Sequence, residues 1–130
     1  MTREELWLNG IACALSGDAP SEPVPDAPAW HYEQMLAAIY DAATSADPAR
    51  AFPERSWHLD EIIYAVYCAV AGLPSVTPPS ATSRIEQFWL DILDALNGGD
   101  GTTTLTPAWR SEECLATVCE AAGSDEEEPE

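Results

Sequence analysis

Apolar residues recur at helical spacing in five segments of the chain, and loops rich in proline and glycine separate these segments. The clearest stripe has the spacing i, i+3, i+4, i+7 and i+11 and consists of Leu59, Ile62, Ile63, Val66 and Val70. β-branched residues form no alternating runs, and only the short stretches SVT and TTTL could hold a strand. The pattern therefore predicts an all-α protein with helices over residues 2–16, about 29–44, 57–71, about 83–96 and 107–122.

Residues that favour helix starts precede three of these segments. Thr2 and Glu5 have the spacing of a capping box, and Ser56 is the expected N-cap of the third helix. Thr106 is the expected N-cap of the fifth helix, with Pro107 as its first residue. The third segment is apolar nearly all round, so we expect it to be the central helix.

Similar stretches recur along the chain. YEQMLAAIYDA (32–42) matches IEQFWLDILDA (85–95) at an offset of 53 residues, including the pairs Glu-Gln and Asp-Ala. LWLNGIACALSG (6–17) matches EIIYAVYCAVAG (61–72). WHLDE (57–61) matches WRSEE (109–113), with a shift of one residue before the following cysteine and glycine. The chain therefore reads as alternating helices of two kinds, A and B, in the order A–B, A–B, A.

This order predicts a single compact five-helix domain over residues 1–123, built from two and a half helical-hairpin repeats. The repeats cover about 2–44, about 56–96 and, as a half repeat, 106–122. Residues 124–130 have the sequence SDEEEPE and include five acids. They are expected to form an acidic, disordered tail.

Three of the four cysteines have a glycine four residues later, as Cys13–Gly17, Cys68–Gly72 and Cys119–Gly123. Each glycine falls just past an expected helix end, where a left-handed backbone favours glycine. The cysteine one turn earlier is then a small buried hydrophobic residue. No C-x₂-C or H-x₃-H pair is present, and a zinc site would require the helix ends to converge. We expect no metal, no cofactor and no catalytic residue.

The charge balance narrows the function classes. The 130 residues include 23 acids, five arginines and no lysine, which gives a net charge of -18. This charge repels nucleic acid and anionic membranes and favours basic partners, although solubility alone could also explain it. No run of 18 apolar residues and no signal-peptide pattern occurs, so we expect a cytoplasmic protein in a bacterial host cell.

The acids are not confined to the tail. The tail holds five of them, so the rest of the chain keeps a net charge near -13. Acids three or four residues apart on a helix have Cβ atoms roughly 5–6 Å apart, and such a row can imitate the phosphates of nucleic acid. On the outward faces of the fourth and fifth helices, the candidate partner contacts are Asp91, Asp94, Glu112, Glu113 and Glu120.

In size and acidity the chain resembles the small acidic inhibitor proteins of phages and bacteria. These include anti-CRISPR proteins that imitate DNA and immunity proteins that neutralise nuclease toxins. The resemblance lies in composition and size, and it transfers no functional residues. It implies a non-enzymatic inhibitor that binds a basic nuclease or nucleic-acid-binding effector, without direct contact to nucleic acid or membrane.

The alternative is a helical scaffold, assembly or chaperone-like adaptor that binds through an apolar groove between helices. Most of the five tryptophans are expected in the core or at helix contacts, with one or two exposed as interface anchors: Trp7, Trp30, Trp57, Trp89 and Trp109. The fifth helix has no hairpin partner, so a homodimer through this helix is a further expectation.

Overall fold

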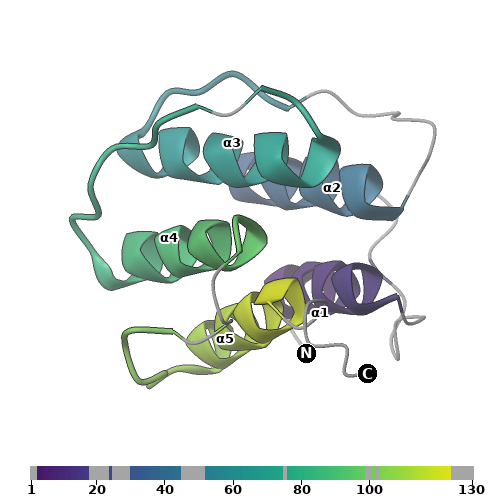
Figure 1. Cartoon of the computed structure of the whole chain (residues 1–130), viewed down its shortest axis with the longest axis vertical. Coiled ribbons are helices and arrows are strands. Elements are labelled where there is room, and N and C mark those ends of the chain that lie inside the picture. The colour runs from purple at the N-terminus through teal and green to yellow at the C-terminus, as the bar shows by residue number, and fades with distance from the viewer. Residues whose placement is uncertain are drawn as a thin grey trace.

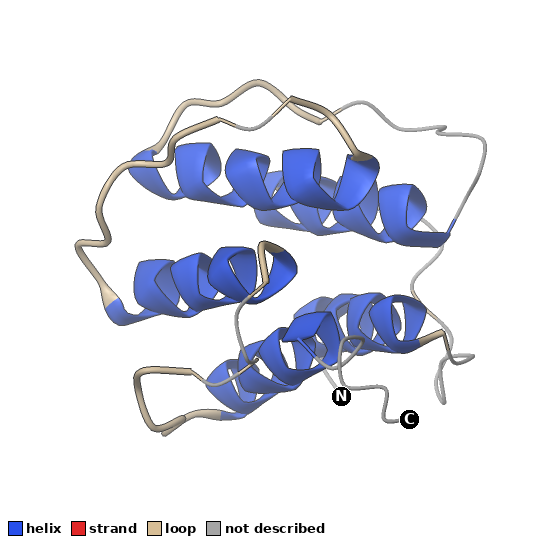
Figure 2. Ribbon diagram, viewed as in Figure 1, coloured by secondary structure: helices blue, strands red, loops and turns tan. Residues whose placement is uncertain are grey.

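In the computed structural model, the described residues are 3–17, 24, 30–44, 52–74, 76–98, 101 and 103–123. Within these residues the chain forms five helices and no strand, so the all-α prediction is confirmed (Figure 1, Figure 2). The helices are α1 (Arg3–Ser16), α2 (His31–Thr44), α3 (His58–Ala71), α4 (Arg84–Leu96) and α5 (Arg110–Gly123).

The five helices form a closed ring. Each helix packs against the next one in the sequence, and α5 packs against α1. All five run in the same direction, and the connecting segments, as far as they are described, lead along the outside of the ring back towards the helix starts (Figure 1). The helices begin 26 to 28 residues apart. The repeated unit is therefore one helix and its return segment.

This arrangement explains the sequence matches and refines the predicted repeat. The offset of 53 residues corresponds to two units, so the matched stretches occupy the same positions in α2 and α4. The neighbouring helices are parallel, whereas helical hairpins would have made them antiparallel. The prediction of a central third helix is wrong, because every helix of the ring packs against two neighbours. The apolar outer face of α3 is covered by Phe52, whose ring centroid lies 5.2 Å from those of Tyr64 and Tyr67.

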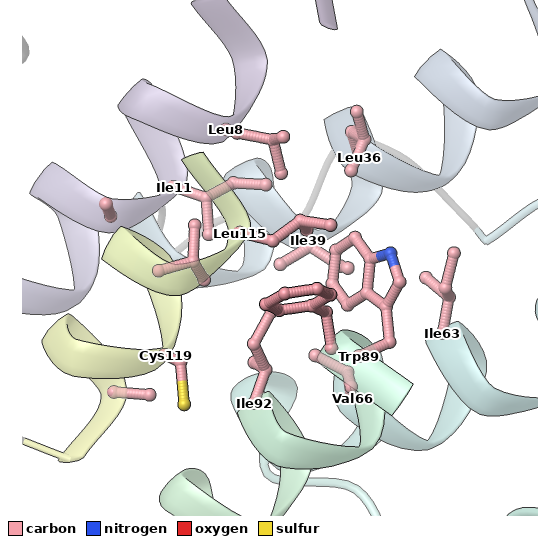
Figure 3. Close-up of a cluster of buried hydrophobic side chains, with 14 of the residues drawn as sticks. Leu8, Ile11, Leu36, Ile39, Ile63, Val66, Trp89, Ile92, Leu115 and Cys119 are labelled. Carbon is pink, nitrogen blue, oxygen red and sulfur yellow. The ribbon is translucent and has the colours of Figure 1, made fainter. Parts of the chain in front are cut away.

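Equivalent residues of the five helices form the core in two layers. The sixth residues of the helices are Leu8, Leu36, Ile63, Trp89 and Leu115, and the ninth residues are Ile11, Ile39, Val66, Ile92 and Val118. All ten side chains are at most 1 % exposed, and nine of them are labelled in the cluster of Figure 3. Full burial of an aliphatic side chain stabilises the fold by about 1.5–3 kcal/mol, so these layers hold the ring together.

Glycine ends two of the helices as predicted. Gly17 and Gly72 have φ angles of 82° and 76°, in the left-handed region that favours glycine. Gly123 is instead the last residue of α5, so the predicted left-handed end is not formed there. The cysteines of the motif pack inside, fully for Cys68 and Cys119 and partly for Cys13.

Tryptophan precedes α3 and α5. Trp57 and Trp109 accept the first hydrogen bonds of these helices through their carbonyl oxygens. The predicted N-caps Ser56 and Thr106 are therefore one and three residues too early, and Thr2 lies outside the described residues. In α3 and α5 the capping carboxylate belongs to the third residue of the helix, Asp60 or Glu112. In α4 the N-cap residue itself also contributes, because the Ser83 hydroxyl accepts a hydrogen bond from the Glu86 amide at 3.4 Å.

Candidate functional site

The first turn of every helix carries a basic residue at its first position and an acid at its third. The five pairs are Arg3/Glu5, His31/Glu33, His58/Asp60, Arg84/Glu86 and Arg110/Glu112. All five acids are buried, with 2–7 % of their surface exposed. Hydrophobic periodicity did not indicate this repeat, although the chain carries a simple signal for it: Arg/His-x-Glu/Asp recurs every 26 to 28 residues.

The basic residue of each helix contacts the acid of the next helix around the ring. The nitrogen–oxygen distances are 2.9 Å for Arg3–Glu33, 2.8 Å for His31–Asp60, 3.7 Å for His58–Glu86, 2.8 Å for Arg84–Glu112 and 3.7 Å for Arg110–Glu5. The last of these contacts joins α5 back to α1. Because a helix of this length spans about 20 Å, the contacts place all five N-termini at one end of the ring.

Three of the acids also cap their own helices. Asp60 Oδ2 accepts hydrogen bonds from the amides of Ser56 at 2.9 Å and Trp57 at 3.1 Å. Glu86 Oε1 accepts from the amide and the hydroxyl of Thr82, and Glu112 Oε1 accepts from the amide of Ala108 at 2.8 Å. A carboxylate here satisfies amides that the helix leaves unpaired and faces the positive end of the helix dipole.

The ionisation of two of these acids reflects their partners. The hydrogen bond from Arg84 lowers the pKa of Glu112 to about 2, against the effect of burial. Burial raises the pKa of Glu86, but hydrogen bonds from Thr82 and the charge of His58 lower it overall. Both side chains are therefore carboxylates at neutral pH, and their charges are used inside the protein.

The structure corrects two of the five predicted partner contacts. Glu112 is buried against Arg84, and Asp91 is also buried, so neither lies on an outward face. Asp91 Oδ2 accepts hydrogen bonds from the amide of Thr104 at 2.8 Å and from its hydroxyl at 3.0 Å, which fixes the return segment between α4 and α5. The side chains of Asp94, Glu113 and Glu120 are exposed, as the prediction required.

The arginines help to explain why the surface is so acidic. Arg50 lies outside the described residues, and each of the other four contacts an acid: Arg3–Glu33, Arg55–Glu61, Arg84–Glu112 and Arg110–Glu5. Three of these four contacts belong to the ring of first-turn pairs. The basic side chains are thus engaged with acids of the fold, and exposed acids such as Asp94 have no arginine partner among the described residues.

Return segments cover the outer furrows, or seams, between neighbouring helices. At the α1–α2 seam, a Cβ atom on Gly10 would lie 2.6 Å from Val24 Cγ1 and 3.0 Å from the Tyr40 ring, so only glycine admits this close approach. At the α4–α5 seam, the amide and the hydroxyl of Thr104 donate hydrogen bonds to Asp91. The other two returns contact α3, through Phe52 against its tyrosines and through the Ser80 carbonyl, which lies 2.7 Å from His58 Nε2.

The α1–α5 seam is different, because it contains two adjoining cavities of about 370 and 220 Å³. The described residues that line them all belong to α1 and α5: Asn9, Ala12, Cys13, Ser16, Arg110, Glu113, Cys114, Thr117, Glu120 and Ala121. Asn9 and Thr117 line both cavities, so together they form one groove, which we call the seam groove. Asn9 Nδ2 is buried there and has no hydrogen-bond partner among the described residues.

A further cavity of about 490 Å³ lies at the N-terminal end of the ring. The second residue of every helix lines it, namely Glu4, Tyr32, Leu59, Ile85 and Ser111. His31, Met35, Trp57 and Asp60 complete its wall. We call it the axial cavity, because contributions from all five helices place it on the axis of the ring.

The tryptophans fall into two groups. Trp7 and Trp89 are in the core, whereas Trp30, Trp57 and Trp109 are 66–69 % exposed. The exposed three occupy the position just before α2, α3 and α5, at the same end of the ring as the axial cavity. The sequence predicted one or two exposed tryptophans and most of the five in the core or at helix contacts, whereas three are exposed. Their shared position could have been inferred only from the one-helix repeat.

Neither a metal site, nor a membrane-spanning helix, nor a similar known protein assigns a function to the described residues. Among the described residues, no group of three or more histidines, cysteines or acids could hold a metal ion, and no helix is long and apolar enough to cross a membrane. Comparison with family models, with curated proteins and with solved structures gives no significant match. A function for this chain must therefore be inferred from its own surfaces and cavities.

Proposed function

We propose that this protein is a non-enzymatic inhibitor that binds a basic, nucleic-acid-binding partner, with its contact centred on the seam groove. The observation that carries the proposal is that exposed Glu113 and Glu120 line an open groove on α5. Asp94 and Glu120 are the eleventh residues of the neighbouring helices α4 and α5, so they extend the acidic surface at one level of the ring. Acids in such a row can take the place of phosphates on a partner's binding surface.

The occupant that fits the groove is an extended segment of the partner with a small apolar side chain between basic ones. The internal model for it is Val24, which fills the α1–α2 seam from a return segment. Glu113 and Glu120 favour lysine or arginine on either side, and an extended backbone offers carbonyl groups that the Asn9 amide can reach by rotating. A second copy of this chain is disfavoured because each copy carries a net charge of -18.

A synthetic peptide, Lys-Val-Lys-Val-Lys-Val-Lys, tests the groove directly by fluorescence anisotropy. We expect binding that weakens steeply between about 50 and 300 mM salt, because exposed charges are screened. The double variant Glu113→Gln/Glu120→Gln should raise Kd by about two- to thirtyfold, because each of the two exposed ion pairs contributes about 0.2–1 kcal/mol. The matched control is Glu54→Gln, which removes an exposed acid from another part of the surface.

Equal losses for the control and the double variant, or binding that ignores salt, would refute a specific acidic groove. For the inhibitory role, affinity capture from host extract at low and high salt identifies the partner. Displacement of duplex DNA from that partner by this protein then tests the mimicry, and a partner that binds DNA and this protein at the same time contradicts it.

The second candidate is the scaffold or adaptor function, which the three exposed tryptophans support. Exposed aromatic residues that gather at one end of a fold are typical of protein contacts. This function predicts binding that tolerates salt and is lost in Trp57→Ala but kept in Glu113→Gln/Glu120→Gln. A homodimer through α5 stays a prediction, and it would have to use other residues of this helix, because Leu115 and Val118 are buried inside the ring.

A further inference from the structure

The axial cavity has the volume of a small-molecule site and is lined by residues from all five helices. Its volume of about 490 Å³ lies in the range of ligand pockets. The core layers beneath it are filled, and Trp89 in the nearer layer is fully buried and hydrogen bonds to Tyr32, which lines the cavity. The cavity remains open at the level of the second residues because two of the five, Glu4 and Ser111, are not the apolar side chains that fill the deeper layers.

The polar groups of the cavity form a chain that ends at a carboxylate. Trp89 Nε1 donates to the hydroxyl oxygen of Tyr32 at 3.3 Å, and Tyr32 in turn hydrogen bonds to Glu4. Burial and the neighbouring Glu5 raise the pKa of Glu4, so its negative charge is poorly compensated. None of the ion pairs among the described residues includes Glu4.

The obvious ligand for five converging helix N-termini is an anion, but the structure argues against it. The acids at the third positions already occupy that role, as Asp60, Glu86 and Glu112 accept hydrogen bonds from backbone amides at their helix starts. An anion in the cavity would also face Glu4. The walls, in contrast, offer apolar surface from Met35, Leu59 and Ile85 and an exposed indole at Trp57.

We propose that the axial cavity binds a small amine whose apolar body packs on these walls and whose ammonium group pairs with the Glu4 carboxylate. Tyr32 holds the carboxylate in place through its hydrogen bond, and the hydroxyl of Ser111 is a second polar group within the wall. The indole of Trp57 covers the ligand at the rim, where its face can also attract the cation. This site is separate from the seam groove, and it does not depend on the inhibitory function.

Three matched probes test the proposal by isothermal titration calorimetry on the full chain: 3-phenylpropylamine, 3-phenylpropanol and 3-phenylpropionate. They share an apolar body and differ in charge. We expect the amine to bind at least about tenfold more tightly than the alcohol, since a hydrogen-bonded ion pair is stronger than a neutral one, and the carboxylate to bind weakest. Glu4→Gln should reduce the amine's affinity to that of the alcohol and leave the alcohol unchanged.

The control variant is Glu113→Gln, which removes an acid from the first turn of another helix outside the axial cavity. It should leave amine binding unchanged, just as Glu4→Gln should leave peptide binding in the seam groove unchanged, so either proposal can fail alone. Ser111→Phe, which places a ring in the cavity, should abolish binding of amine and alcohol while thermal unfolding confirms a folded chain. Equal binding of amine and alcohol, a preference that survives Glu4→Gln, or no binding of any probe overturns the proposal.

Discussion

Replacing Asp60 by alanine tests whether the acids of the first turns stabilise the ring. The side chain is 2 % exposed and accepts hydrogen bonds from two backbone amides, while His31 Nε2 of the preceding helix lies 2.8 Å away. Loss of a helix cap costs about 1 kcal/mol, and loss of a charged hydrogen-bonding partner costs about 1.5–3 kcal/mol. We therefore expect Asp60→Ala to lower the free energy of unfolding by about 2–4 kcal/mol.

Urea unfolding followed by far-ultraviolet circular dichroism measures this change, with thermal unfolding as a second readout. For a chain of this size the expected decrease in Tm is about 6–15 °C. Glu61→Ala is the matched control, because Glu61 is the next acid along the helix and is exposed. Within the described part of the chain, its ion pair is with exposed Arg55 at 3.2 Å. Its cost should stay within about 1 kcal/mol, as is usual for surface ion pairs.

A double-mutant cycle with His31→Ala separates the contact between helices from the cap. We expect a coupling free energy of about 1 kcal/mol between the two side chains. If Asp60→Ala costs no more than Glu61→Ala, or if the coupling is absent, the ring of first-turn pairs does not stabilise the fold and the reasoning fails.

Two further predictions concern acid stability and a helix end. Stability should fall as pH decreases from about 5 to 2, because unfolded carboxylates bind protons at their ordinary pKa near 4.5 while the folded pKa of Glu86 is lowered and that of Glu112 is about 2. Arg84→Gln should flatten this dependence, and equal slopes in urea titrations of both proteins would contradict it. Gly72→Ala should cost about 1 kcal/mol because φ is 76°, although a Cβ atom there meets no neighbour. Gly72→Asn should cost less, since asparagine tolerates this region, and an equal cost would argue against backbone strain.

The helices and their buried faces follow from the sequence because hydrophobic periodicity depends only on local geometry. The stripe through Leu59, Ile62, Ile63, Val66 and Val70 placed α3 within one residue of its observed start. Such a stripe does not indicate whether neighbouring helices run parallel or antiparallel, because both arrangements bury the same residues. The lengths of the connections did carry a signal, since 12 to 14 residues between helices exceed what a hairpin needs and suffice for a return along the helix.

The candidate surfaces were less predictable, because the sequence does not show which acids are used internally. Asp91 and Glu112 were assigned to the surface on the general rule that acids are exposed. Their burial depends on partners distant in the sequence, Thr104 and Arg84, and on the parallel order that brings first turns together. Glu113 and Glu120 are exposed as expected, but the groove beside them arises from the packing of α1 on α5.

The contact that closes the ring has a consequence for how the chain folds. Arg110 and Glu5 are separated by more than a hundred positions in the sequence, whereas the other pairs in the ring lie within about thirty. Docking of α5 on α1 must therefore overcome the largest loss of chain entropy, which favours its formation late. An open helical array can grow or fray one unit at a time from its ends. In this ring the contact between α1 and α5 leaves no free end, so every helix has two neighbours and the ring should unfold as a whole.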